Sequence, residues 1–569
     1  MKHRTNALPR LLTAAVTLMS ASAWGKEPDV KEGNLAVTMK VDASKSLGPL
    51  EPAWAYFGYD EPNYTTMEHG RALLKELSAL SPVPVYIRTH NLLTSGDGTA
   101  SLKWGSTNAY TEDLAGRPVY DWTILDRIFD TFRETGVVPL VEIGFMPEAL
   151  SVKPEPYRHH FPDGEIWAGW GYPPKDYGKW ADLVYHWVRH CVDRYGEKAV
   201  ATWLWEVWNE PDIAYWQGTP EEYFKLYDYS ADAVKRALPA ARIGGPHSTG
   251  PRYPHAADFL RRFLDHCAHG TNYATGKTGS PLDYVGFHPK GDTAMVDGHV
   301  RMGIAHQLES IARGFEIVTS FPEYRKTPII LGESDPEGGA AYSAKRFPQN
   351  GYRNGSQYPA YTAAVLAGTY DLARRTHANL MGSVTWAFEF EGQPYFEGYR
   401  TLATNGIDKP ILNLFRMLGL MRGQRLQLDS TGAIGAESLL KTGARERPDI
   451  SGLASGTDRD ISVLLWHYHD DDVAGPAASV RLAVNEITSS PKRVLVRKYA
   501  IDEQHSNAFT VWKDMGSPQT PTPAQVETLR AAGQLTAEGS PEWLSVQDGQ
   551  VDVDVTLPRQ SVTLLQLSW

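Results

Sequence analysis

The stretch WLWEVWNEPD, residues 203–212, is an apolar run that closes on polar side chains. Glu206 and Glu210 are four residues apart in it, and Glu210 directly follows Asn209. A short run rich in aromatic and aliphatic residues predicts a buried β-strand. The strand is therefore expected to carry Asn209 and Glu210 at its carboxyl end.

The same arrangement, a short apolar run that ends on polar side chains, recurs along the chain. The runs are residues 52–61, 83–90, 137–147, 202–211, 242–248, 283–291, 327–335 and 382–390. Amphipathic helical patterns lie between them, for example at 121–136, 219–238 and 358–375. Eight strand–helix units predict the α/β class and a closed (β/α)8 TIM barrel, whose site lies at the carboxyl ends of the strands. An open doubly wound sheet is the alternative, but no glycine-rich phosphate motif follows the first run.

The regions that flank the barrel have a different character. We assign residues 51–415 to the catalytic barrel. In residues 416–569, short strand patterns separated by turns predict a C-terminal β-sandwich. Residues 34–50 alternate in polarity, so residues 24–50 are expected to add one or more N-terminal strands to that sandwich.

The first residues resemble an export signal. Basic side chains precede the short apolar run LLTAAVTLMSASA (11–23), which ends on small residues. This pattern predicts a cleaved signal peptide over residues 1–23, because the run is too short to span a bilayer. We therefore expect an exported protein, periplasmic or extracellular, that has no membrane association once the signal is removed.

The net charge bears on nucleic-acid binding, and the cysteine content bears on disulfide formation. The formal net charge is −11 and no basic stripe occurs, which argues against a nucleic-acid partner. The two cysteines, Cys191 and Cys267, fall in helical patterns that are not neighbours in a barrel. Two separate buried thiols are therefore favoured over one disulfide.

Two strand-end acids could perform chemistry together. Glu210 ends the fourth run and Glu333 ends the seventh, in PIILGES (328–334). These strands face each other across the mouth of an eight-stranded barrel, and glycoside hydrolysis needs two carboxylates on either side of one bond. Asn209 would bind a sugar hydroxyl beside the acid. Each acid taken alone could instead cap a helix or pair with an arginine.

Several segments resemble one known family. EVWNEPD (206–212), FMPEAL (145–150) and YIRTHNLL (86–93) are similar to glycoside hydrolase family 39, which contains β-xylosidases and α-L-iduronidases. Further similar segments are GYDEPNYTTMEHGRALLKEL (58–77), GIDKPILNLFRMLGLM (406–421) and IDEQHSNAFTVWKDMGSPQTPT (501–522). The resemblance covers about residues 50–569, and its bacterial β-xylosidase branch fits best.

The resemblance implies a retaining mechanism with Glu210 as general acid/base and Glu333 as nucleophile. Glu333 must then be ionised and held by hydrogen bonds. Glu210 must be protonated, so its pKa is expected to be raised, partly by the charge of Glu333. The carboxyl groups should lie about 5–5.5 Å apart.

Further residues are candidates for substrate binding. His288, in VGFHPKG, matches a family position that contacts the sugar, although it could also be a core histidine. The family usually has tyrosine two residues later, where this sequence has Lys290, which would suit an acidic sugar or would reach to water. His90 is expected to bind a ring hydroxyl. Arg88 is expected near the substrate or as the buried partner of Glu333 or of Glu206, which we interpret as structural.

Aromatic and outer residues complete the predicted pocket. The resemblance implies that Phe145 forms a wall and Trp386 a platform under the sugar, although both could be core residues. One acid after Trp386, either Glu389 or Glu391, is expected to bind outer hydroxyls. The long loop 337–361 is expected to shape the pocket entrance and restrict it to chain ends.

These observations predict an exo-β-xylosidase that acts on xylo-oligosaccharides without a cofactor or metal. An α-L-iduronidase or α-L-arabinosidase would use the same two glutamates. A non-catalytic glycan-binding protein is disfavoured by the intact pair. The segment WHYHDDD (466–472) contains two histidines, but its distance from the barrel mouth predicts a solvated acidic turn rather than a metal site.

Overall fold

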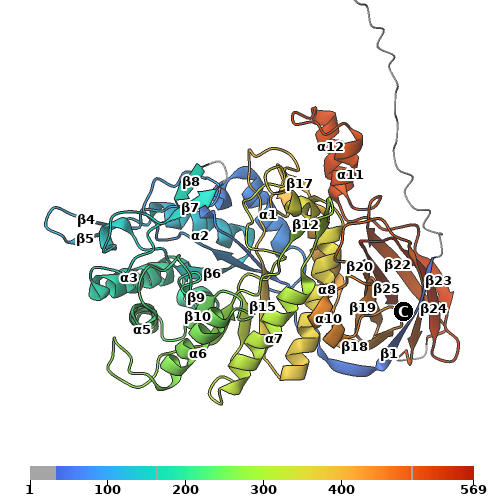
Figure 1. Cartoon of the computed structure of the whole chain (residues 1–569), viewed down its shortest axis with the longest axis horizontal. Coiled ribbons are helices and arrows are strands. Elements are labelled where there is room, and N and C mark those ends of the chain that lie inside the picture. Colours follow the sequence, from blue (N-terminus) through green and yellow to red (C-terminus); the bar gives the residue numbers. More distant parts are fainter. Residues whose placement is uncertain (1–33, 162–163, 168, 488–490) are drawn as a thin grey trace, which may run out of the picture.

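The computed structural model describes residues 34–569 apart from 162–163, 168 and 488–490 (Figure 1). The predicted signal peptide, residues 1–23, lies outside the described residues. Within them, no helix combines the length and the apolarity that crossing a bilayer requires.

Eight parallel strands close into a barrel, as the sequence predicts. In barrel order they are β2 (Tyr56–Tyr59), β3 (Tyr86–Thr89), β6 (Val138–Ile143), β9 (Leu204–Val207), β10 (Arg242–Ser248), β11 (Tyr284–Phe287), β14 (Ile329–Leu331) and β15 (Leu380–Thr385). Each lies inside one of the predicted apolar runs or overlaps its start. The carboxyl ends of these strands therefore meet at one mouth.

Helices surround the barrel. They are α1 (Glu68–Ser78), α2 (Thr123–Thr135), α3 (Tyr177–Tyr195), α4 (Glu197–Val200), α5 (Pro220–Ala237), α6 (Pro254–His269), α7 (Ile304–Ser320), α8 (Gln357–Thr376) and α9 (Pro410–Leu420). Helix α5 begins where the sequence predicts, because Thr219 and Glu222 form a capping box, which is worth about 1 kcal/mol. Cys191 on α3 and Cys267 on α6 are both free and buried, as expected.

A nine-stranded sheet forms the second part of the molecule (Figure 1). Its strands are β1 (Leu35–Pro49), β18 (Gln424–Ser430), β19 (Asp449–Gly456), β20 (Asp460–Tyr468), β21 (Ala478–Asn485), β22 (Arg493–Ile501), β23 (Glu542–Ser545), β24 (Val551–Leu557) and β25 (Ser561–Ser568). Inward side chains from both halves of the sheet share one hydrophobic core, which gives the β-sandwich character. The predicted fold class, a TIM barrel with an accessory β-sandwich, is confirmed.

The first strand of the chain lies between strands from its last third. β1 pairs antiparallel with β18 and parallel with β21. Three helices that the sequence analysis did not predict also belong to this region: α10 (Ala436–Thr442), α11 (Ala508–Asp514) and α12 (Pro523–Gly533). Thr522 and Gln525 form a capping box at α12, a signal that the sequence does contain.

The turn after β20 is buried against the barrel at His469–Asp471, where the prediction of a solvated turn is wrong, whereas residues 472–475 are exposed. His469 is 6% exposed and Asp470 is fully buried. The Asp470 carbonyl accepts the Met302 N–H at 2.8 Å, and the Asp471 carboxylate binds the Arg301 guanidinium. Arg301 belongs to the hairpin β12 (Ala294–Val296)–β13 (His299–Arg301), which follows the sixth barrel strand. The turn is therefore part of the contact between sandwich and barrel.

Candidate active site

A cavity of about 210 Å³ opens at the carboxyl ends of the barrel strands. Glu210 follows β9, Lys290 follows β11 and Glu333 follows β14. The full lining is Lys103, Asn209, Glu210, Ile213, Tyr215, Lys290, Glu333, Gly338, Gly339, Ala340, Ala341 and Tyr342. The two glutamates that the sequence analysis singled out, and Asn209 beside them, therefore border one hollow.

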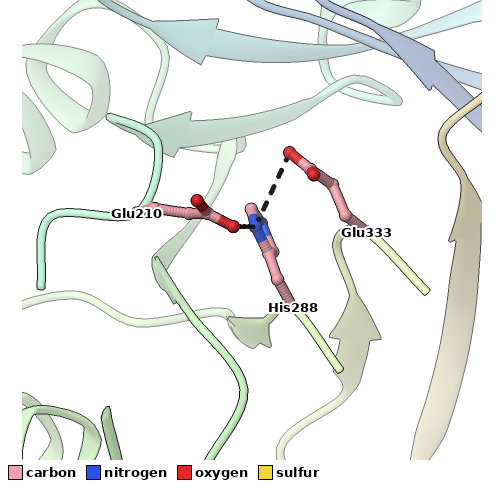
Figure 2. Close-up of side chains that lie close together, drawn as sticks. All are labelled: Glu210, His288 and Glu333. Atoms are coloured by element: carbon pink, nitrogen blue, oxygen red, sulfur yellow. Dashed lines mark hydrogen bonds and ion pairs between the residues drawn. The ribbon is translucent and has the colours of Figure 1, made fainter. Parts of the chain in front are cut away.

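Glu210 and Glu333 extend toward each other on either side of His288 (Figure 2). His288 Nδ1 lies 2.9 Å from Glu210 Oε1 and 3.6 Å from Glu333 Oε1. One oxygen of Glu210 and one of Glu333 lie within 4.8 Å of each other. Both carboxyl groups are nearly buried, with Glu210 4% and Glu333 3% exposed. The structure therefore brings together the pair and the histidine that the sequence analysis named.

Lys290 bridges the two carboxylates. Its Nζ lies 2.5 Å from Glu210 Oε1 and 2.7 Å from Glu333 Oε2. Burial raises the pKa of Glu210, but Lys290 and the His288 hydrogen bond outweigh it, so the pKa falls to about 2. The expected rise in the Glu210 pKa is therefore wrong. The sequence shows a lysine two residues after His288, but not that its ammonium reaches this oxygen.

Arg88 lies beneath the pair and is fully buried. Its guanidinium donates to Glu206 Oε1 at 2.7 Å, to Glu333 Oε1 at 3.1 Å and to Asn209 Oδ1 at 3.1 Å. Both carboxylate partners that the sequence suggested for this arginine are present at once. Although burial opposes ionisation, Lys290, His288 and Arg88 hold the pKa of Glu333 well below its usual range. The geometry suits an ionised nucleophile.

His90 does not line the cavity, and its two ring nitrogens are bound by the carboxylates of Asp60 and Glu142. Its Nδ1 lies 2.7 Å from Asp60 Oδ1, and its Nε2 lies 3.0 Å from Glu142 Oε2. Burial raises the pKa of Glu142 well above its usual range. The sequence analysis missed Asp60 and Glu142, although Glu142 is a lone acid inside an apolar run and could have been noticed.

The predicted aromatic residues lie behind the cavity surface. Phe145 is 2% exposed, stacks on Tyr215 and meets the edge of Trp208. Trp386 is also 2% exposed and packs on His90 and on the Arg88 guanidinium. The rings that do line the cavity are those of Tyr215 and Tyr342.

Glu389 and Glu391 bind backbone amides instead of lining the cavity. Glu389 Oε1 accepts the Gly406 N–H at 2.6 Å, and Glu391 Oε2 accepts the His69 N–H at 3.0 Å. The structure therefore brings neither acid to the cavity.

The loop after Glu333 supplies one wall of the cavity through Gly338–Tyr342. A fully buried arginine, Arg353, holds this wall from behind. It donates to the carbonyls of Tyr342 at 2.6 Å and Gly339 at 2.9 Å, and to Glu337 Oε1 at 2.6 Å. The backbone of this wall is therefore held in place by Arg353.

The backbone is strained where the fourth and fifth strands reach the mouth. Trp208, Glu210 and His247 have φ values of 71°, 46° and 51°, in the left-handed region. Such residues cost about 1–3 kcal/mol each and gather at functional sites. The Glu210 N–H donates to the His247 carbonyl at 3.0 Å, so the two strained segments support each other.

Comparison with known proteins gives a consistent result. A β-xylosidase of Geobacillus stearothermophilus is 27% identical over 491 residues, 85% of this chain and 86% of that protein. The α-L-iduronidase of Homo sapiens is 27% identical over 565 residues, 92% of this chain and 76% of that protein. The structure of a monomeric β-xylosidase from Caulobacter crescentus CB15 shares the fold, with a TM-score of 0.71 over 93% of this chain and 99% of that one, at 24% identity. The family model of glycosyl hydrolases family 39 matches residues 37–550, so the chain belongs to that family and is a glycosidase.

Proposed function

We propose that the protein is a retaining exo-glycoside hydrolase in which Glu333 is the nucleophile and Glu210 the general acid/base. The observation that carries the proposal is the spacing of the two carboxylates, which have oxygens within 4.8 Å of each other. Retaining enzymes need about 5–5.5 Å so that one carboxylate can attack directly, whereas inverting enzymes leave about 6.5–9.5 Å for a water.

The chemistry follows from these two groups. Glu333 attacks the anomeric carbon while Glu210 gives its proton to the departing glycosidic oxygen. The C–O bond of the leaving group breaks as the Glu333 ester forms. Glu210, now ionised, takes a proton from water, whose oxygen attacks the same carbon and releases Glu333. Arg88 supports the nucleophile throughout, because its guanidinium lies 3.1 Å from Glu333 Oε1.

The preferred substrate in this proposal is a β-D-xyloside at the non-reducing end of a xylo-oligosaccharide. The cavity, about 210 Å³, is closed on one side by the Gly338–Tyr342 wall, and this size suits one terminal sugar. The similarity to bacterial β-xylosidases supports xylose as that sugar.

A second candidate is an α-L-iduronidase-type activity on an acidic sugar. Two ammonium groups, those of Lys290 and Lys103, line the cavity, and a carboxylate on the sugar would bind such groups. The similarity to α-L-iduronidases of mouse and human supports this candidate.

The test is turnover of p-nitrophenyl β-D-xylopyranoside against a panel of arabinosides, glucuronides and iduronides. Xylose release with the anomeric configuration retained in the first product, read by proton NMR, is expected. Glu333→Ala should abolish it, and azide should restore glycosyl transfer in Glu210→Ala. Turnover of only the uronides would favour the second candidate. Inverted product would overturn the roles of both glutamates.

We also propose that the chain is exported through residues 1–23. N-terminal sequencing of protein recovered from the periplasm or the medium should begin near residue 24. A full-length protein that stays in the cytoplasm would contradict export.

A further inference from the structure

The ammonium of Lys290 lies between the two catalytic carboxylates. We propose that Lys290 is a movable counterion that bridges Glu210 and Glu333 in the empty enzyme and leaves Glu210 when a glycoside binds. The inference rests on the proposed roles of the two glutamates. It assigns to Lys290 a step that neither glutamate can perform alone, namely the conversion of Glu210 from an ion-pair partner into an acid.

The contacts of Glu210 favour its ionised form. Its Oε1 lies 2.5 Å from Lys290 Nζ and 2.9 Å from His288 Nδ1. Two nitrogen donors on one oxygen stabilise the carboxylate, whereas a general acid must carry a proton. Release of the ammonium from this oxygen leaves Glu210 close to the negative charge of Glu333, which favours the uptake of one proton from solvent water by Glu210.

Glu333 does not depend on Lys290 in the same way. Lys290 contacts Glu333 Oε2 at 2.7 Å, while Arg88 holds Oε1 at 3.1 Å from below. If the ammonium turns toward a substrate oxygen, Glu333 keeps a fixed, buried cation and stays ionised. The nucleophile and the acid therefore respond differently to the same displacement.

The surroundings of Lys290 leave room for the displacement. The side chain is 20% exposed and lines the cavity. The second cavity ammonium, that of Lys103, is ion-paired with Asp60 at 2.8 Å. Lys103 is therefore a matched control, because its substitution removes one ammonium from the same cavity, and that ammonium is paired with Asp60 rather than with Glu210 or Glu333.

The titration of Glu210 takes place among several other groups. Arg88 lies in β3 and His247 in β10, while His90 follows β3, His288 follows β11 and Glu333 follows β14. The other groups around Glu210 and Glu333 are Lys103, Tyr157 and Tyr215 of loops, and Asp212 of the segment that carries Glu210. Burial lowers the pKa of His288 to about 4, so this imidazole is neutral near pH 7. Lys290 is thus the cation in direct contact with Glu210 at that pH.

A ligand-free titration tests the bridge. Carbon-13 NMR of enzyme labelled at glutamate Cδ, with Glu210→Gln to assign the signal, reports the Glu210 pKa directly. Lys290→Met should raise that pKa by at least about 2 units relative to wild type, since one ion pair is lost in a buried site. Lys103→Met should shift it by less than about 0.5 unit. Equal shifts in the two variants, or none in Lys290→Met, would overturn the proposal.

Kinetics test the displacement. With methyl β-D-xylopyranoside, whose leaving group needs a proton, the alkaline limb of kcat/KM follows Glu210 in the empty enzyme and that of kcat follows the complex. We expect the kcat limb to lie about 1–2 pH units above the kcat/KM limb in wild type, and the two limbs to coincide in Lys290→Met. Coincident limbs in wild type would overturn the displacement.

A third substrate separates this proposal from the proposed function. 2,4-Dinitrophenyl β-D-xylopyranoside needs no proton to leave, so its kcat/KM should lose the alkaline limb if Glu210 is the acid. Persistence of that limb would refute the role of Glu210 itself, whatever Lys290 does. If no xyloside is turned over, the NMR titration still decides whether Lys290 bridges the pair.

Discussion

The barrel mouth and the turn after β20 both gather acids and histidines at the end of a strand, yet they use them differently. At the mouth, Glu210 and Glu333 border a cavity and are bridged by one flexible ammonium. In the turn, the carboxylate of Asp470 is bound by the Tyr468 hydroxyl at 2.6 Å and the Ala444 N–H at 3.1 Å. In the turn, fixed hydrogen-bond donors occupy the Asp470 carboxylate. At the mouth, a movable ammonium leaves Glu210 and Glu333 free to react with a substrate. The comparison teaches that the partner, rather than the residue type, decides whether such a cluster can do chemistry.

The largest expected contrast between the two regions is in activity. Glu333→Ala should lower kcat by roughly 10⁴-fold or more, because it removes the proposed nucleophile. Asp471→Ala in the turn should change kcat by less than about 2-fold, since its partner Arg301 lies away from the cavity lining. Both are measured on p-nitrophenyl β-D-xylopyranoside, and a comparable loss in Asp471→Ala would erase the contrast.

The next contrast is in stability, and it involves Arg88. Arg88→Met should lower the free energy of unfolding by about 3–5 kcal/mol, because it strands the buried carboxylates of Glu206 and Glu333. Urea denaturation at pH 7 measures this loss. A variant as stable as wild type would mean that the barrel interior tolerates these charges unpaired.

The stability of Asp470→Asn and wild type as a function of pH tests how burial acts on an acid in the turn. Burial raises the pKa of Asp470 to about 6, above its usual value of 3.8. The folded state then binds the proton more tightly than the unfolded chain, so this group costs stability as the pH rises between those values. The advantage of Asp470→Asn over wild type in unfolding free energy should grow by about 1–3 kcal/mol from pH 4 to pH 7. A pH-independent difference would contradict the raised pKa.

The smallest expected effect is that of Arg301→Gln. The Arg301 side chain is 30% exposed and that of Asp471 13%, so water screens the pair. Its loss should cost less than about 1 kcal/mol, with kcat unchanged. Thermal denaturation beside the Arg88→Met variant gives the direct comparison, and a cost near that of Arg88→Met would show that the turn is as tightly coupled as the mouth.

Much of the barrel could be predicted because each of its strands is marked by a pattern in a few consecutive residues. A short apolar run that ends on polar side chains identifies both the strand and the direction of its carboxyl end, and this placed Asn209, Glu210 and Glu333 at the mouth. The same rule says nothing about how deep a large ring lies. Phe145 and Trp386 were therefore expected on the cavity surface, but they pack behind it.

The parts that could not be predicted depend on loops. Lys103 reaches the cavity from a segment without periodicity, so no pattern marks it. The length of the loop 337–361 placed that loop at the pocket, but no pattern showed that Gly338–Tyr342 would form the wall. The direction of the Glu210 pKa depends on where one flexible ammonium rests, a matter of a few ångströms. Glu389 and Glu391 follow the last strand as expected, but nearby backbone N–H groups bind their carboxylates away from the cavity.

The position of β1 sets the order in which the molecule can be completed. β1 leaves the ribosome before any barrel strand, but its two neighbours, β18 and β21, are synthesised only after the whole barrel. Both edges of β1 stay unpaired until then, which exposes them to pairing with other chains. A shortened chain that ends at residue 415 would keep this strand and lose both neighbours. The sheet is therefore complete only when β1 and strands from the last third of the chain meet, and a single cut after the barrel would leave β1 attached to the barrel and paired in the sheet.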